Sequence, residues 1–312
     1  MKPILLSYLV CPTCQQNLEC VATILSNIDI EEGFLFCNIC HKQVPIIRGI
    51  PRFVNDDQPL QGENINTAHA FGWEWQTFQV LHGLEQYKAQ FFDWIYPIQS
   101  KFFEGKIILD AGCGMGRFSI VSSEFGAKTV FAVDASQAVD VAKQNLENYP
   151  NTHVIQADIH NLPFRTREDA QVDFIFSIGV LHHLDNPQQG FNDLIRHLKL
   201  SGSIFFWVYG RENNDWLVNI INPIRTQLTS RLPKSVLYVL SGLMTLGIHP
   251  ILKLVYRPAN DISALAWLKE LLPYYDYLAW LGQFQFRHNH HVIFDHLVAP
   301  VAFYLHRQDI EK

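Results

Sequence analysis

The sequence predicts an α/β fold with a doubly wound, mostly parallel β-sheet. Three observations lead to this prediction. Five short apolar segments alternate with helical segments after residue 105, a glycine-rich turn follows the first of them, and two Cys-x-x-Cys pairs precede the whole pattern. Strands that alternate with helices form parallel sheets. We therefore expect one α/β domain behind a small cysteine-bearing module.

The composition is that of a globular chain and disfavours a nucleic-acid binder. Apolar residues make up 48% of the chain and aromatic residues 13%, which is enough to build a core. The net charge is −6, whereas proteins that bind nucleic acid usually carry a basic face. The apolar residues before Cys11 are too few for a secretory signal, so we expect a cytoplasmic protein.

Five segments follow from these patterns. We expect a zinc ribbon at 1–55, a linker with N-terminal helices at 56–105, an α/β domain at 106–212, a helical insertion at 213–286 and a C-terminal segment of the α/β domain at 287–312. The polar stretch 56–63 is typical of a linker.

Within the α/β domain the elements are predicted by apolar runs and turn signals. We expect strands at 106–110, 129–134, 153–156, 172–177 and 203–209, and helices at 116–125, 136–148 and 187–198. Residues 309–312 look like the start of a further helix. Either the sheet is short, or residues 284–305 supply an unusual strand, or the chain is a truncated form.

The glycine turn and two acidic residues indicate a ligand crevice. Glycines let the backbone approach a ligand closely, and the helix that follows adds its N-terminal N–H groups. Asp134 ends the second strand, where an acid can hold ribose hydroxyls, and Asp158 follows the third strand, where it can accept from an adenine amino group. The candidate cofactor-binding residues are Asp110, Gly112, Gly114, Gly116, Asp134, Ala135, Asp158, Ile159, Ser177 and Trp73.

Five motifs in this order resemble class I methyltransferases of the type 11 kind, which use S-adenosylmethionine (SAM). The motifs lie at 110–116, 133–136, 157–164, 173–184 and 198–203, and the usual Pro-Gly of the last is Ser201-Gly202 here. The resemblance covers roughly residues 106–210. It implies a Rossmann-like fold and SAM as the cofactor, and says little about the substrate. An NAD-binding domain is the alternative, but the Gly-x-Gly-x-Gly turn and the later motifs do not suit a dehydrogenase.

The two Cys-x-x-Cys pairs are separated by 22 residues and indicate a structural zinc site. The expected ligands are Cys11, Cys14, Cys37 and Cys40. A reduced, metal-free thiol cluster is the alternative. Cys20 and Cys113 are expected to lie outside the site, and His41 is expected to be exposed. Residues 1–55 also resemble Trm112-like modules, including the tail at 45–51.

A ribbon in front of this fold also resembles rRNA guanine methyltransferases. An rRNA or tRNA methyltransferase that docks RNA through the ribbon is therefore an alternative. The acidic charge balance and the absence of an Asn/Asp-Pro-Pro-Tyr form of the fourth motif argue against it. We favour a stabilising role for the ribbon or the docking of a protein partner.

Histidines and tryptophans near the crevice are candidates for chemistry. Methyl transfer needs an aligned acceptor, and it needs a base only when the acceptor must lose a proton. His182 and His183 follow the fourth strand, so one is expected to contact SAM and the other to act as the base; alternatively, both only shape the loop. Trp73 or Trp75 is expected to lie against the sulfonium by cation–π attraction, with ordinary core packing as the alternative.

A second histidine group lies near the C-terminus. Its members are His288, His290, His291, Asp295 and His296. They form a base-and-orienter pair, a metal site or a polar surface, and we favour the polar surface.

Residues 235–252 contain no Asp, Glu, Lys or Arg. Their length reaches the lower limit for a membrane span, but Gly242, Gly247, His249 and Pro250 weaken that interpretation. We favour a helical lid that encloses the substrate, with peripheral contact to a membrane as the alternative.

The sequence thus predicts a SAM-dependent methyltransferase that methylates an oxygen or carbon of a small, hydrophobic or lipid-like acceptor. The acceptor is expected to face Tyr209, Arg211, Asn213 and Asn214 after the fifth strand. The protein is expected in the cytoplasm, free or peripheral to a membrane. A SAM-binding docking protein without turnover is the alternative.

Overall fold

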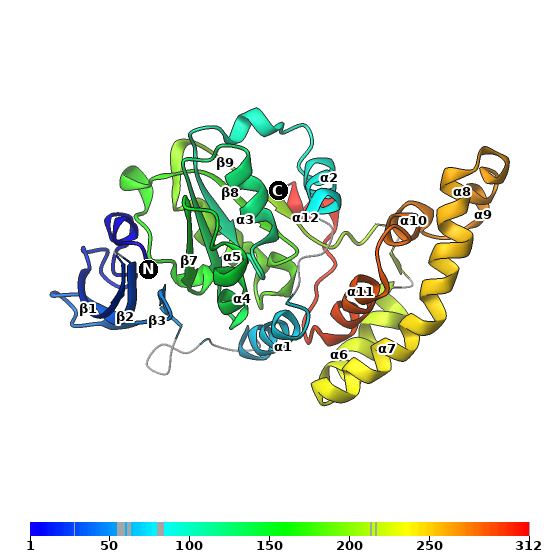
Figure 1. Cartoon of the computed structure of the whole chain (residues 1–312), viewed down its shortest axis with the longest axis horizontal. Helices are drawn as coiled ribbons and strands as arrows, with labels where there is room; N and C mark the ends of the chain where they lie inside the picture. The colour runs from blue at the N-terminus through cyan, green and yellow to red at the C-terminus, as the bar shows by residue number, and fades with distance from the viewer. Residues whose placement is uncertain are drawn as a thin grey trace. The chain divides into compact units, whose positions relative to one another are not determined.

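The computed structural model describes residues 1–27, 29–54, 60, 64–79, 84–212, 214–215 and 217–311 (Figure 1). The chain forms two compact units. The first comprises Met1–Val218 with Val301–Lys312, and the second is Asn219–Pro300. Apart from residue 60, the expected linker at 56–63 lies outside the described residues, as does Asn213.

The first unit begins with a small antiparallel sheet, which we call the ribbon (residues 1–54). Its strands are β1 (Glu19–Ser26), β2 (Asp29–Phe36), β3 (Gln43–Ile47) and β4 (Ile50–Pro51), paired in that order. Leu35, Val44 and Ile46 are buried between them. So small an apolar core gives limited stability, and domains of this size usually need a metal or disulfides as well.

The rest of the unit is the expected parallel sheet with helices on its faces. Its strands are β5 (Ile107–Ala111), β6 (Thr129–Asp134), β7 (Thr152–Gln156), β8 (Val172–Ile178) and β9 (Leu198–Trp207). Its main helices are α1 (Asn64–Thr77), α2 (Leu84–Trp94), α3 (Arg117–Glu124), α4 (Ala138–Asn145) and α5 (Pro187–Ile195). The strand order is β7-β6-β5-β8-β9 and every pair is parallel. The chain therefore changes direction between β5 and β8, and such a switch point is where open α/β sheets bind ligands.

Helices cover one face of this sheet. Phe91 of α2 and Phe118 of α3 stack with their ring centres 5.0 Å apart, over Phe176 of β8. Farther along the same face, Val139 and Ala142 of α4 pack on β6 and β7. Parallel sheets are normally buried on both faces, so the opposite face of this sheet must also be covered by other parts of the chain.

The ribbon supplies much of that second cover. The connection from β7 to β8 contains only the 3₁₀ turns Ile159–Asn161 and Arg167–Asp169, so no α-helix shields this side of β6. Instead the ribbon and the sheet share one apolar core with α5, and Tyr8 meets Phe131 of β6 edge-on at 5.1 Å between ring centres.

Backbone pairing also joins the ribbon to the sheet. Arg52 forms a parallel bridge with Gln156 at the end of β7, and Leu9 forms an antiparallel bridge with Phe164. The ribbon is therefore a layer of the first unit and not a tethered appendage.

The last part of the α/β domain differs from the expectation. The predicted helix at 187–198 ends at Ile195, and the last strand begins at Leu198 because the Ser201-Gly202 motif lies within β9. After the second unit the chain returns to β9, where Leu305 bridges Gly210 in parallel, before α12 (Arg307–Ile310). Within 284–305 the structure has a long helix, and the pairing is confined to this bridge.

The second unit is helical. It contains α6 (Asn222–Gln227), α7 (Lys234–Ile251), α8 (Arg257–Asp261), α9 (Leu268–Leu271), α10 (Tyr275–Leu281) and α11 (Phe286–Val298). A π-helical turn, η8 (Leu252–Tyr256), joins α7 to α8 without a break. Since α11 packs along α7, this unit extends beyond the expected boundary at residue 286.

Candidate functional site

The turn after β5 is shaped by its three glycines. Gly112, Gly114 and Gly116 all have positive φ angles, which side chains rarely adopt. A Cβ on Gly112 would lie 2.3 Å from a methyl carbon of Val180, in the loop after β8. The glycines therefore bring the loops at the switch point together, in addition to any approach to a ligand.

Asp134 connects the end of β6 to this turn. One of its carboxylate oxygens accepts from the backbone N–H of Gly114 at 2.9 Å. The other accepts from the N–H and the hydroxyl of Ser136 at 2.8 and 2.7 Å. The carboxylate is fixed and half-exposed at the crevice, as a ribose-binding group requires. Ala135 follows directly in the same loop.

The acid after β7 is held in a similar way. Asp158 accepts from the N–H of His160 at 3.0 Å and begins the short 3₁₀ turn that contains the buried Ile159. His160 in turn pairs with Asp193 of α5 at 2.8 Å. Asp158 is thus placed at the third strand end, on the same edge of the sheet as Asp134.

Two other predicted cofactor-binding residues, Ser177 and Asp110, are buried next to the glycine turn and form hydrogen bonds within the protein. Ser177 is fully buried and donates to the carbonyl of Ala111 at 2.9 Å. Asp110 is also buried and accepts from the hydroxyl of Ser119 at 2.6 Å. Burial, followed by the nearby charge of Asp134, raises the pKa of Asp110 to about 7 against the Ser119 hydrogen bond. Both residues are placed to shape the site more than to touch a ligand.

Helix α1 crosses the ends of three strands. Gly72 packs on Ser136 after β6, and the ring of Phe71 meets His183 after β8 at 5.0 Å. The indole of Trp75 lies on Gly114, so that a Cβ there would be 3.0 Å from the ring. α1 therefore covers the ends of β5, β6 and β8.

The structure separates the two candidate tryptophans. Trp73 is half-buried in α1, and its carbonyl accepts from Thr77. Trp75 is the tryptophan that lies on the glycine turn. The guanidinium of Arg117 lies 5.7 Å from the centre of the Trp75 ring and makes a cation–π contact with it. Both residues were predicted as candidates from the sequence, and only the packing of α1 shows that Trp75 is the one that contacts the glycine turn.

The predicted histidines lie together beside the C-terminal segment. His182 is fully buried, with its ring 4.0 Å from that of Tyr209 and 4.1 Å from that of His183. The backbone N–H of Phe303 donates to the His182 carbonyl. Nδ1 of His183 hydrogen-bonds the carbonyl of Val301 at 2.5 Å. Because a carbonyl only accepts, this bond places the proton of a neutral His183 on Nδ1 and leaves Nε2 as a proton acceptor.

Three of the residues expected to face the acceptor, Tyr209, Arg211 and Asn214, are described and follow β9. Leu305 donates to the carbonyl of Tyr209, and Arg211 donates to the carbonyl of Leu305, each at 2.9 Å. The Asn214 side chain donates to Gly210. Tyr304 stacks on Tyr209 at 5.3 Å. The contacts of the C-terminal segment with His183 and Tyr209 were not predicted from the sequence, because Val301 and Tyr304 belong to no recognisable motif.

The second histidine group is dispersed around α11. His290 contacts Ser241 of α7 at 2.9 Å, whereas His288 stacks on Phe284. His296 contacts Tyr277. Among the described residues, these histidines form no metal-binding group; the cysteine cluster of the ribbon does.

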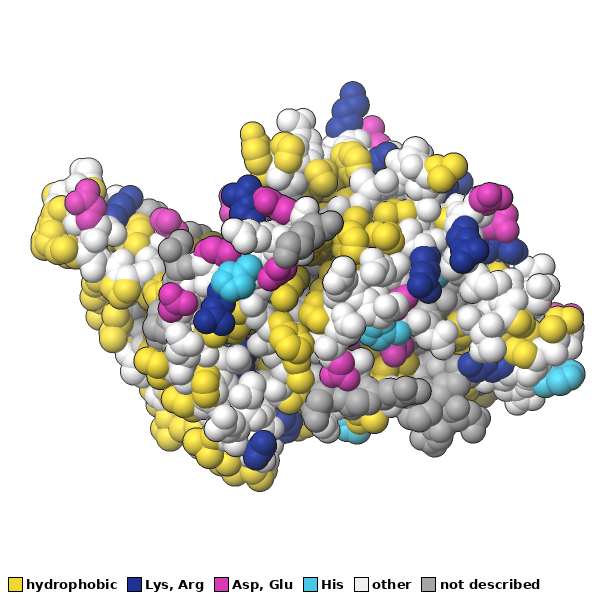
Figure 2. All heavy atoms as spheres, turned by 180° about the vertical axis from the view of Figure 1, so that it is seen from behind, with side chains coloured by type: hydrophobic (Ala, Val, Ile, Leu, Met, Phe, Trp, Pro, Cys, Tyr) yellow, Lys and Arg dark blue, Asp and Glu magenta, His cyan; other side chains and the backbone are white. Residues whose placement is uncertain are grey.

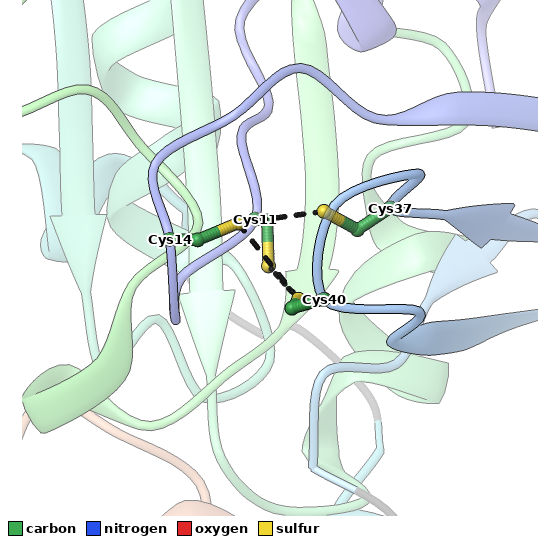
Figure 3. A group of neighbouring side chains, drawn as sticks. All are labelled: Cys11, Cys14, Cys37 and Cys40. Atoms are coloured by element: carbon green, nitrogen blue, oxygen red, sulfur yellow. Dashed lines mark hydrogen bonds between the residues drawn. The ribbon is translucent and has the colours of Figure 1, made fainter.

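The four predicted cysteines converge (Figure 3). Their sulfur atoms all lie within 4.8 Å of one another, with Cys11–Cys40 and Cys14–Cys37 at 3.4 Å. Four thiolates at ~2.3 Å from one tetrahedral ion would stand about 3.8 Å apart, so the cluster fits a four-coordinate metal.

Two matching knuckles build this cluster. In each one the residue after the second cysteine, Gln15 or His41, has a positive φ and donates its N–H to the first cysteine's carbonyl. His41 is exposed and Cys20 lies on β1, outside the cluster. Burial raises the pKa of Cys37, but hydrogen bonds from the backbone N–H groups of Cys40 and Ile39, together with those from the thiols of Cys14 and Cys40, outweigh burial and bring this pKa down to about 7.

One ribbon residue, Arg52, contacts residues near the ends of β6 and β7. Arg52 is buried and donates to Gln156 at 2.9 Å and to Gln137 at 3.2 Å, and it pairs with Asp140 at 2.7 Å. Gln156 donates to the carbonyl of Ala135 at 3.1 Å. A polar chain therefore runs from the ribbon to the loop after Asp134. A buried arginine of this kind has no local sequence signal.

Comparison with known proteins finds similarity in the central part of the chain. Residues 109–206 match the family model described as a methyltransferase domain. A mitochondrial ubiquinone biosynthesis O-methyltransferase of Dictyostelium discoideum is 31% identical over 113 residues, covering 33% of this chain and 35% of that protein. The ubiquinone biosynthesis O-methyltransferase of Coxiella burnetii (strain RSA 493 / Nine Mile phase I) is 29% identical over 134 residues, covering 41% and 56%. The chain thus spans about half or less of these relatives.

Among solved structures, a SAM-dependent methyltransferase from Aquifex aeolicus is 25% identical, with a TM-score of 0.33, covering 37% of this chain and 64% of that one. A complex of the Haloferax volcanii Trm112 methyltransferase activator with a putative methyltransferase matches at 21% identity and a TM-score of 0.34, covering 48% and 59%.

We expect a metal ion bound by the four cysteines to stabilise the whole first unit, because the ribbon covers one face of the parallel sheet. Cys37→Ser should lower the midpoint of thermal unfolding and increase binding of a dye that detects exposed apolar surface. Cys20→Ser is the matched control. This variant should have the same unfolding midpoint, the same dye binding and the same metal content as the wild type. Unchanged unfolding of a metal-free Cys37→Ser protein would contradict this coupling.

Arg52→Gln should weaken SAM binding by roughly tenfold, about 1.4 kcal/mol, because it loosens the loop around Ala135. Arg48→Gln is the control, since Arg48 reaches the same Asp140 carboxylate at 3.4 Å with its side chain 72% exposed, where an ion pair contributes little. Calorimetric titration measures both affinities. Equal affinities for the two variants would show that the buried contact does not support the site.

The raised pKa of Asp110 predicts that the contribution of this residue to the stability of the ligand-free protein falls as the pH rises from about 4 to about 7. The folded state holds the Asp110 proton longer than the unfolded state does, so the contribution of Asp110 to the free energy of unfolding falls through this window, by at most about 4 kcal/mol. Asp110→Asn keeps an acceptor for Ser119 and should remove this dependence. Urea unfolding at several pH values compares the two proteins, and parallel curves would contradict the prediction.

Proposed function

We propose that this protein transfers a methyl group from SAM to an oxygen or carbon of a small, hydrophobic acceptor. The observation that carries the proposal is that the ends of the neighbouring strands β5, β6 and β7 lie on one edge of the sheet, beside the switch point and within residues that match a methyltransferase domain. Two relatives named for O-methylation in ubiquinone biosynthesis support an oxygen acceptor. The protein is proposed to act in the cytoplasm or at a membrane surface.

The residues at the crevice suit this cofactor. The Asp134 carboxylate, fixed by Gly114 and Ser136, would hold the ribose hydroxyls, and Asp158 would accept from the adenine amino group. SAM supplies a methyl carbon bonded to a positively charged sulfur. The chain's part is to position the acceptor in line with that bond and to exclude water, which α1 favours by covering the strand ends.

We assign the proton-accepting role to His183. Its Nδ1 is engaged by the Val301 carbonyl, so Nε2 is the nitrogen that can take a proton from an acceptor hydroxyl. As the oxygen–carbon bond forms and the sulfur–carbon bond breaks, the hydroxyl proton passes to Nε2. His182 is fully buried against Tyr209 and is proposed as a positioning residue.

We propose zinc as the metal of the ribbon. Four thiolates and no carboxylate form a soft donor set, and a closed tetrahedral site of this kind is structural. The ion would hold Cys11, Cys14, Cys37 and Cys40 together and take no part in methyl transfer.

The test separates binding from turnover. SAM affinity is measured by calorimetry, and methyl transfer is measured with radiolabelled SAM and long-chain alkylcatechols as acceptors. Asp134→Ala should abolish measurable binding. His183→Ala should keep the SAM affinity and lower kcat by about 10²–10⁴-fold. His182→Phe, which keeps an aromatic ring, should affect KM more than the pH profile of kcat.

Two outcomes would contradict the proposal. A folded wild-type protein that does not bind SAM would exclude the cofactor assignment. A protein that binds SAM but transfers no methyl group to any acceptor would favour a SAM-binding docking protein. A His183→Ala variant with unchanged kcat would remove only the base assignment.

A further inference from the structure

Helix α7 and its continuation are unusual for a helix of a folded unit. Residues Lys234–Ala259 form one run of 26 residues, and by length and composition it is apolar enough to cross a membrane. Only 22% of its most apolar window is buried. A core helix of a soluble protein would be mostly buried, so this helix presents its apolar surface outward.

The buried side of α7 is partly polar. It carries Leu237, Ser241 and Thr245, and Ser241 contacts His290 of α11 at 2.9 Å. The outward face is a stripe of aliphatic side chains, at least half exposed and spaced three to five residues apart on one side of the helix. We call it the outer stripe: Val236, Val239, Leu243, Leu246, Ile251 and Leu254.

Figure 2 shows this surface as a band of hydrophobic side chains along the outer edge of the helical unit, at the lower left of that view. Leu243 is 61% exposed and Leu254 is 74% exposed. Isolated exposed leucines are common on proteins, but a continuous apolar stripe over five turns marks a surface that binds something apolar.

The packing of α7 favours a helix that lies on a membrane over one that spans it. A spanning α7 would take α11 with it into the hydrocarbon, because the two helices are packed together. α11 carries Arg287, Asp295 and several histidines, and charged groups at that depth are costly.

The charge of the same unit suits an anionic lipid surface. Residues 219–300 contain seven Lys and Arg but four Asp and Glu, although the whole chain has a net charge of −6. Basic residues flank the outer stripe: Arg231 and Lys234 at its start, Lys253 and Arg257 toward its end. Trp267 of the same unit is 59% exposed, and indoles favour the membrane interface.

From these observations we propose that the outer stripe docks the protein on an anionic lipid surface, with α7 parallel to the membrane plane. The stripe enters the acyl boundary, and the flanking basic residues stay at the headgroups. The proposal does not rest on methyl transfer, since it concerns a unit without any of the predicted SAM-binding residues.

The experiment is flotation of the full-length, metal-loaded protein with vesicles. One set contains phosphatidylcholine alone and the other contains phosphatidylcholine with phosphatidylglycerol. The wild type should float with the anionic vesicles, more weakly with the neutral ones, and less at high salt. The triple variant Val239→Ser, Leu243→Ser, Leu246→Ser should lose at least about tenfold in partitioning.

A matched control removes three exposed apolar side chains from the first unit: Ile4→Ser, Ile24→Ser and Leu200→Ser. It should float like the wild type. Circular dichroism and SAM titration check that both variants are folded.

Absence of flotation with either vesicle, or equal flotation of the stripe variant and the wild type, would overturn the proposal. So would a concentration-dependent dimer that the stripe variant abolishes in a protein that does not float, because the stripe would then bind a second copy.

Discussion

The apolar contact between the ribbon and the parallel sheet is the interaction on which the first unit depends. Parallel strands must be covered on both faces, and the β7–β8 connection supplies no α-helix. The ribbon takes that place through Tyr8 and the core it shares with β6. Domains as small as the ribbon usually need a metal or disulfides for stability, so the proposed metal at the four cysteines would also support the packing of the sheet.

The same contact connects the ribbon to the crevice. Because the tail of the ribbon runs parallel to the end of β7, Arg52 is buried beside the loop that follows Asp134. The loop is also held by Gly114, which in turn touches Trp75 of α1. Separate segments thus fix one carboxylate, and preorganisation of this kind reduces the entropy lost when a ligand binds.

The two units divide the chemistry between them. The first carries the carboxylates, the cysteine cluster and the histidine pair. The second is apolar on its outside and richer in basic than acidic residues. A hydrophobic acceptor would reside in a lipid phase, so a lipid-binding unit attached to a methyltransferase domain would bring enzyme and acceptor to the same surface. The predicted lid role of this insertion stays a prediction.

The parallel sheet, the glycine turn and the four clustered cysteines could be predicted from the sequence, because each is encoded by spacing within a short stretch. The sequence also placed Asp134 and Asp158 at strand ends. The choice of Trp75 at the turn, the Val301 carbonyl on His183 and the buried Arg52 came only from the tertiary structure. So did the helix in place of a strand at 286–298. These features depend on contacts between segments far apart in the chain, and such contacts leave no local pattern to read.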